Sequence, residues 1–261
     1  MGCSASTSKI EWKPGTPLSA IQSQFKPLDL IVFRGSEYVS DAIALAQKFR
    51  FGSGEWTHVG LVITTDLVPI KNGKQGQLYI WESTMSGPLA DGVNSIETGK
   101  GKLGVQIRSL ADVIDKYDAS EDSRIGWCEL LNNPLVRLQD ESDETYNRRQ
   151  ESIRQLLTEF YDLYGDADYD LNICRLCASV CDRSNTKGTC GVETIFGRSK
   201  TLFCSELVAT IYQLLGLLGA EIDPEKITPE ELVGNTNTGS QPLPCPVKLP
   251  PVVITREWPT P

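Results

Sequence analysis

Two residues of the chain have the types and the local setting needed for nucleophilic chemistry. Cys204 begins an apolar segment of helical periodicity, and His58 is the only histidine. A thiol at the N-terminus of a helix lies near unpaired backbone N–H groups and the positive end of the helix dipole, which favour the thiolate. An imidazole can take up the thiol proton and form an ion pair with the sulfur. We therefore expect a cysteine nucleophile, with the N–H groups of the same helix start available to stabilise an oxyanion.

A carboxylate on a neighbouring strand could hold the imidazole in one tautomer and orientation. Glu82 ends the apolar segment LYIWE, which follows the strand that carries His58. We expect these strands to form a hairpin in which His58 lies directly opposite Glu82 and Val62 lies opposite Leu78. The two polar side chains would then be neighbours on one face of the sheet.

Each of these residues also has a structural interpretation. Cys204 could be a small buried residue at a helix start, and His58 could be a core histidine with its hydrogen bonds satisfied. Glu82 could be a strand end that reaches solvent, while Glu37 and Glu55 are alternative carboxylates near the same strands. Spacing alone does not decide between these interpretations and catalysis.

The segments that position these residues indicate an α+β protein. Apolar runs and alternation predict strands at 28–33, 57–63, 78–82 and 124–131, and an edge strand in PVVITREW. Helical spacing predicts helices at 36–48, at 142–163 and in TLFCSELVATIYQLLGLL, and Ser109 is placed to cap a short helix through Tyr117. The apolar face expected for the 142–163 helix consists of Tyr146, Ile153, Leu156, Leu157, Phe160 and Leu163.

The chain divides into three parts by composition. We predict a flexible tail at residues 1–25 and a catalytic domain at residues 26–235, with a cysteine-rich insertion at about 172–200. A proline-rich extension follows at residues 236–261.

Composition excludes several classes of protein. The net charge is −9 and the pI is near 4.8, so we expect no nucleic-acid partner. We find no apolar run long enough to cross a bilayer and no apolar core of a signal peptide. Eight cysteines in 261 residues are too sparse for a disulfide scaffold, so we expect thiols.

Several segments together resemble the circularly permuted NlpC-type, papain-like hydrolases of the YiiX/YebB group, which also occur in poxviruses and other large DNA viruses. The resemblance covers roughly residues 27–235, in the segments LDLIVFRG, THVGLVI, YIWE, LYGDADYD, LFCSELVATIYQLLG and ITPEELVG. Its most specific pieces are the His-Val-Gly strand and the Phe-Cys-Ser-Glu-Leu helix start, in that order.

The resemblance implies a permuted papain-like fold, with an antiparallel sheet packed against the nucleophile helix. It also implies that Cys204 is the nucleophile, His58 the general base and Glu82 the orienting third member. Tyr169 and Asp170 match the Tyr-Asp signature of the group, where we expect fold support or a wall of the substrate site.

The insertion departs from this resemblance and carries four cysteines, Cys174, Cys177, Cys181 and Cys190. Four thiolates could hold a tetrahedral zinc ion, but their spacing is not one of the usual zinc-binding patterns. We therefore expect no metal site and no cofactor.

The N-terminal residues match an acylation signal. Met-Gly-Cys-Ser-Ala-Ser fits the pattern for myristoylation at Gly2, and Cys3 is placed for palmitoylation. The alternative is an unmodified tail. Acylation would place the protein on the cytoplasmic side of a membrane, which would be a host membrane or a virion membrane if the source is viral.

These observations predict a cysteine hydrolase or acyltransferase that acts on an amide or ester bond through a thioester. The expected substrate is an acyl compound, a peptide or a lipid, and the expected partner is the membrane. The alternative is a membrane-associated structural or interaction protein that uses the same fold without catalysis.

Overall fold

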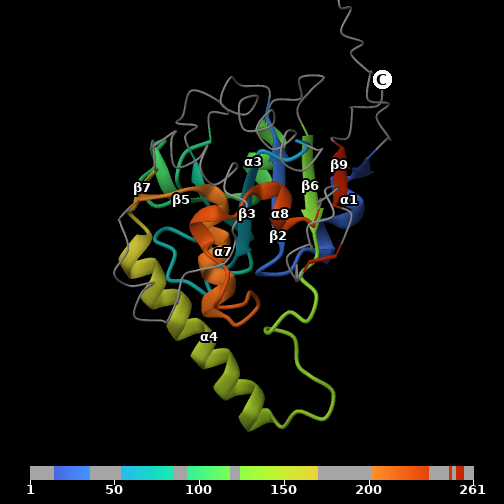
Figure 1. Cartoon of the computed structure of the whole chain (residues 1–261), viewed down its shortest axis with the longest axis vertical. Coiled ribbons are helices and arrows are strands. Elements are labelled where there is room, and N and C mark those ends of the chain that lie inside the picture. The colour runs from blue at the N-terminus through green and yellow to red at the C-terminus, as the bar shows by residue number, and fades with distance from the viewer. Residues whose placement is uncertain are drawn as a thin grey trace, which may run out of the picture.

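The computed structural model describes residues 15–35, 54–84, 93–117, 124–169, 201–234, 247–248 and 251–255. These residues form an α+β structure built on one open, mostly antiparallel sheet of seven strands (Figure 1). The predicted α+β class is therefore confirmed.

The order of the strands brings the two halves of the chain together. Across the sheet the strands are β1 (Thr16–Pro17), β9 (Val252–Thr255), β6 (Arg124–Cys128), β2 (Leu30–Arg34), β3 (His58–Ile63), β4 (Tyr79–Thr84) and β5 (Gly104–Ser109). Only the β1–β9 pair is parallel among these neighbours. A second, two-stranded parallel sheet joins β7 (Asp168–Tyr169) to β8 (Thr201–Leu202).

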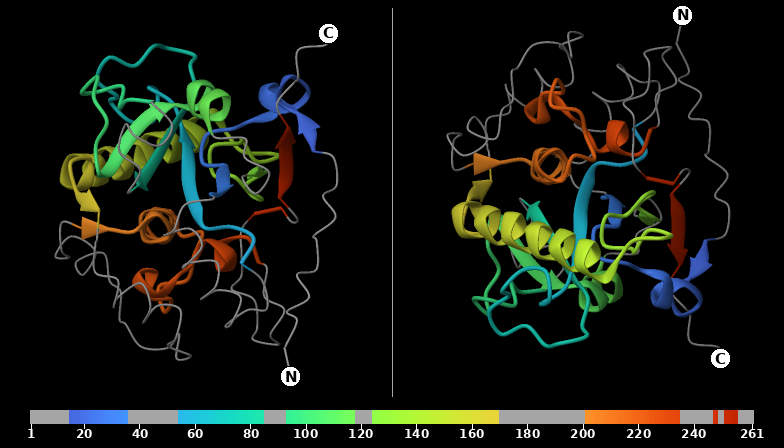
Figure 2. Two further views of the ribbon diagram at one scale, coloured as in Figure 1. Left: turned by 90° about the horizontal axis from the view of Figure 1, so that it is seen from above. Right: turned by 90° about the horizontal axis from the view of Figure 1, so that it is seen from below.

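Helices cover both faces of the sheet, as Figure 2 shows. One face packs against α4 (Asp143–Tyr164), α7 (Cys204–Leu214), the 3-10 turn η2 (Pro224–Lys226) and α8 (Pro229–Leu232). The other packs against α1 (Leu18–Ile21), the 3-10 turn η1 (Gln22–Gln24) and α3 (Leu110–Lys116). None of the helices in the described ranges is long and apolar enough to span a bilayer.

The alternation of side chains along the strands supplies a core to each face. Val59 and Leu61 of β3 face α7. Val62 lies on the opposite face of the strand, which it shares with Gly60, and faces α3. Strand β2 is central and apolar on both faces, as a strand covered on both sides must be.

Serine caps fix the starts of two predicted helices. The Ser109 side chain accepts from the Asp112 N–H at the start of α3, and that of Ser142 accepts from the Thr145 N–H at the start of α4. The predicted apolar face of α4 is wrong at Leu163, which is 47% exposed, because the buried stripe ends on Tyr164 instead.

Two boundary predictions need correction. The expected flexible tail reaches too far, because Ile21 and Phe25 are buried and the Phe25 ring packs on that of Trp127 at 5.3 Å. The predicted edge strand at the C-terminal end is β9, which lies inside the sheet between β6 and β1. The helix predicted at 36–48 and most of the proline-rich extension lie outside the described residues.

The predicted register of the β3–β4 hairpin is wrong by two residues. Val62 pairs with Ile80 and not with Leu78, and continuing that register places Gly60 beside Glu82. A shift of two keeps the parity of the faces, so His58 and Glu82 still share one face as diagonal neighbours.

The sheet also opens between β3 and β4. Their ladder ends at the Leu61–Trp81 pair, although β2 stays paired with β3 as far as His58 and β5 stays paired with β4 as far as Thr84. At the end of the sheet that carries His58 and Glu82, β3 and β4 are therefore split, although each stays paired with its other neighbour.

We predict that Gly60→Ala destabilises the protein. A Cβ at this position would lie 2.6 Å from Cγ1 and Cδ1 of Ile80 and 3.2 Å from Cβ of Glu82, so these groups would have to move. We expect the free energy of unfolding to fall by about 1–3 kcal/mol, measured by urea denaturation. The same change should cost less in an Ile80→Ala background, and equal losses in both backgrounds would contradict this explanation.

Candidate active site

Cys204 is the first residue of α7, and several contacts fix the start of that helix. The Ser83 hydroxyl donates to the Leu202 carbonyl at 2.6 Å, and the Ser205 hydroxyl donates to the Ile227 carbonyl at 2.6 Å. The Phe203 N–H donates to the Glu206 carboxylate at 3.2 Å. Cys204 is buried, as predicted, and its position is tied to β4 and to the segment before α8.

His58 is held from two sides by backbone hydrogen bonds just before it. The Thr57 N–H donates to the Phe33 carbonyl of β2 at 2.8 Å, and the Trp56 N–H donates to the Glu230 carboxylate of α8 at 2.9 Å. The Phe33 ring lies 5.4 Å from the imidazole, centroid to centroid, and forms one wall for it. The imidazole therefore has little freedom to leave its position.

The imidazole joins Cys204 to Glu82. Its Nε2 lies 2.6 Å from Oε2 of Glu82, and the ring also interacts electrostatically with Cys204. Because Nε2 is engaged by the carboxylate, the nitrogen left for the sulfur is Nδ1. The structure thus brings together Cys204, His58 and Glu82, the three residues with predicted catalytic roles.

The charges around the imidazole favour its protonated form. Burial opposes protonation, but the negative charge and hydrogen bond of Cys204, followed by those of Glu82, raise the pKa of His58 to about 10. At neutral pH the imidazole is therefore protonated.

Arg108 is a fourth member of this group. Its Nε donates to Oε1 of Glu82 at 2.6 Å, and its side chain is 4% exposed. Burial opposes ionisation of Glu82, but the charge of Arg108 and the hydrogen bond and charge of His58 lower the pKa of this carboxyl to about 2. Glu82 is therefore ionised throughout the physiological range of pH.

The sequence analysis did not identify Arg108. A signal was present, because Arg108 and Gln106 are polar positions that alternate with buried Val105 and Ile107 on one strand. Gln106 pairs directly with Glu82, and its buried Oε1 accepts no hydrogen bond from the described part of the chain. Without the order of the strands, this alternation does not show which carboxylate the arginine meets.

The other predicted site residues fall into three groups. Tyr169 lies in β7 and pairs with Leu202, two residues before the cysteine, which brings the Tyr-Asp segment next to the helix start. Glu55 pairs with Arg124 at 3.0 Å and not with the histidine. The remaining residues singled out by the sequence analysis lie outside the described ranges. They are Gly2, Cys3, Glu37, Asp170 and the insertion cysteines Cys174, Cys177, Cys181 and Cys190.

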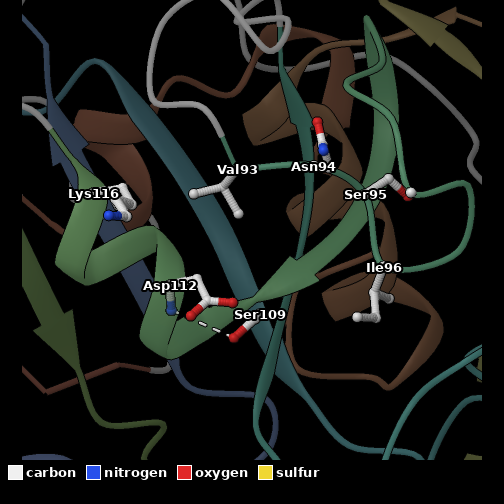
Figure 3. Close-up of a pocket in the computed structure, with 8 residues that line it drawn as sticks. Val93, Asn94, Ser95, Ile96, Ser109, Asp112 and Lys116 are labelled. Carbon is white, nitrogen blue, oxygen red and sulfur yellow. Dashed lines mark hydrogen bonds between the residues drawn. The ribbon is translucent and has the colours of Figure 1, made fainter.

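A pocket of about 370 Å³ lies beside this charged group, between α3 and the segment before β5 (Figure 3). Its lining residues are Val93, Asn94, Ser95, Ile96 and Gly99 on one side and Ser109, Asp112 and Lys116 on the other. The carbonyl of Val93 accepts from Nη1 of Arg108 at 3.5 Å, so one lining residue touches the arginine. Neither His58 nor Cys204 lines this pocket.

No protein-family model matches the chain, and no curated protein matches it with significant similarity. The chemistry of the chain must therefore be inferred from its own residues.

We predict that the imidazole of His58 titrates near pH 10. Because the chain has one histidine, selective isotope labelling gives a single imidazole whose protonation can be followed by NMR. Cys204→Ala should lower the pKa of His58 most and Glu82→Gln should lower it less, in the order of their contributions. The stability that the charged imidazole provides should be complete below pH 6.5 and lost as the pH rises through about 10. Titration of the wild-type ring near 6.5 would contradict the ion pair.

Proposed function

We propose that the protein is a cysteine-dependent hydrolase or acyltransferase that acts on an amide or ester bond. The observation that carries this proposal is the position of the His58 ring, which interacts with Cys204 and is hydrogen-bonded to the Glu82 carboxylate. A histidine that served only the core would need neither a sulfur at a helix start nor an ionised carboxylate. The combination is the one that activates a thiol for attack on a carbonyl carbon.

The residues divide the reaction into two steps. The Cys204 thiolate attacks the carbonyl carbon, and backbone N–H groups at the start of α7 stabilise the oxyanion. The C–N or C–O bond breaks, and the leaving group takes the proton of His58, which leaves a thioester and a neutral imidazole. His58 then removes a proton from water or another acceptor, which attacks the thioester, and the C–S bond breaks to release the acyl product and restore the ion pair.

The permuted papain-like, NlpC-type fold is part of the same proposal. Support comes from the chain order, in which the strand of His58 precedes the helix of Cys204, and from the packing of that helix on an antiparallel sheet. The split between β3 and β4 also supports it, because the helix start lies near both strands at that end.

We propose an acyl compound, a peptide or a lipid as the substrate class and a membrane as the working place. Dual acylation at Gly2 and Cys3 would concentrate the enzyme at a membrane surface, on its cytoplasmic side, where lipids and lipidated proteins are available. For a viral source, that surface is a host or virion membrane.

We predict that catalysis depends on Cys204, His58 and Glu82 to different degrees. In a screen of thioester, ester and amide substrates, Cys204→Ala should abolish turnover and His58→Ala should reduce it at least about 10²-fold. Glu82→Gln keeps the shape and an acceptor but loses the charge, so its loss should be smaller. Activity that survives Cys204→Ala would end the proposal.

Thiol alkylation tests the same mechanism without a substrate. Peptide mapping after a pulse of iodoacetamide should find Cys204 labelled much faster than Cys128, the other free cysteine in the described ranges. His58→Ala should remove this excess. Equal labelling of Cys204 in wild type and His58→Ala would favour a non-catalytic scaffold with this fold.

We predict that membrane attachment needs both acylation sites. A myristoyl chain alone binds with only about 10⁴ M⁻¹, and the net charge of −9 gives no polybasic support. Gly2→Ala should therefore move the protein to the soluble fraction, and Cys3→Ser should leave it myristoylated but loosely attached. Fractionation of cells decides this, and a Cys3→Ser protein that stays fully membrane-bound would contradict dual acylation.

A further inference from the structure

Four buried or nearly buried groups form one continuous chain of charges across the split in the sheet. They are the sulfur of Cys204, the imidazolium of His58, the carboxylate of Glu82 and the guanidinium of Arg108. They come from four different elements, α7, β3, β4 and β5. With Cys204 as the thiolate of the proposed mechanism, the group holds two positive and two negative charges, in alternation.

We propose that Arg108 is a positioning residue whose charge neutralises Glu82 and thereby leaves the imidazolium of His58 to pair with the Cys204 thiolate. This inference rests on the proposed function, because it assumes that the thiolate is the working form of Cys204. Arg108 acts through Glu82 and does not touch the reacting atoms.

The argument for this role starts from burial. The Glu82 side chain is fully buried, and those of Arg108 and His58 are 4% and 21% exposed, so water screens the group poorly. Without Arg108, one imidazolium would have to balance two negative charges. Burying an uncompensated charge is costly, so one of the two anions would take a proton.

Geometry indicates which anion would be protonated. Glu82 holds Nε2 of His58 at 2.6 Å, and a carboxylate is intrinsically the weaker base of the two. The imidazolium would therefore stay with Glu82, and Cys204 would become a thiol. The charge of Arg108 therefore allows Glu82 to orient the imidazolium without competing with the Cys204 thiolate for it.

The hydrogen bonds also explain why an arginine occupies this position. Each Glu82 oxygen has its own partner, since Oε1 accepts from Arg108 and Oε2 faces His58, which fixes the plane of the carboxylate. The guanidinium reaches from Glu82 to the Val93 carbonyl, which anchors its far side. A lysine would keep the charge but would lose this forked contact.

The test compares Cys204 alkylation in Arg108→Met, Arg108→Lys and wild type, with peptide mapping at pH 7. One neighbouring charge changes a proton equilibrium by about 10- to 10³-fold, so we expect Arg108→Met to slow alkylation of Cys204 by at least about tenfold. Arg108→Lys should lie between this variant and wild type. As a matched control, Arg149→Met removes an arginine of α4 whose partner Glu141 is outside the group of four, and it should leave the rate unchanged.

A double variant distinguishes an effect of the Arg108 charge on Cys204 from a role of Arg108 in supporting the fold. Glu82→Gln combined with Arg108→Met removes one negative and one positive charge, so a lone thiolate–imidazolium pair is again balanced. We expect Cys204 in this double variant to react faster than in Arg108→Met alone. A loss that is additive in the double variant would show that Arg108 only supports the fold, and would overturn the proposal.

The outcomes distinguish this inference from the proposed function. Fast alkylation in both wild type and Arg108→Met would remove the role of Arg108 and leave the cysteine mechanism standing. Slow alkylation of Cys204 in wild type would contradict both the role of Arg108 and the proposed cysteine mechanism. If circular dichroism shows that Arg108→Met does not fold, Arg108→Lys decides. A rate for Arg108→Lys below that of wild type supports the role of the forked contact with Glu82, and a rate equal to that of wild type shows that only a positive charge is needed.

Discussion

The carboxylate of Glu82 is the group on which the candidate site depends, because it is fully buried and shared between two cations. Its two oxygens bond a histidine on one neighbouring strand and an arginine on the other, each at 2.6 Å. A buried charge of this kind is tolerated only with complete pairing, so the strands on both sides must be in register. The sheet and the site are therefore set by the same contacts.

A second constraint is that the nucleophile comes from a different layer of the structure. Helix α7 belongs to one core of the protein, whereas His58 and Glu82 lie on the face of the sheet that belongs to the other. The two meet at the end of the sheet where the ladder between β3 and β4 has already ended. A regular sheet of the same strands would hold the sulfur and the imidazole on opposite sides.

Local patterns predicted β2, β3, β4, β6 and β9 and the capped helices α3 and α4, and they singled out Cys204, His58 and Glu82, whose catalytic roles came from the family resemblance. They could not give the register, because a shift of two residues preserves every apolar and polar face, and the actual pairing depends on the packing of Ile80 beside Gly60. Arg108 was missed for a related reason. Its role depends on β5 lying next to β4, a long-range pairing that no short segment specifies, and the resemblance to a permuted papain-like family has no bearing on it.

The short parallel pair of β7 and β8 has a consequence for the cysteine-rich segment at residues 170–200. The described residues that flank that segment are close together, since Asp168 pairs with Thr201 and Tyr169 with Leu202. Closing a longer loop between fixed ends costs little additional entropy. The insertion can therefore grow, shrink or be exchanged during evolution while Ser83 continues to hold Leu202, and with it the start of α7, in place.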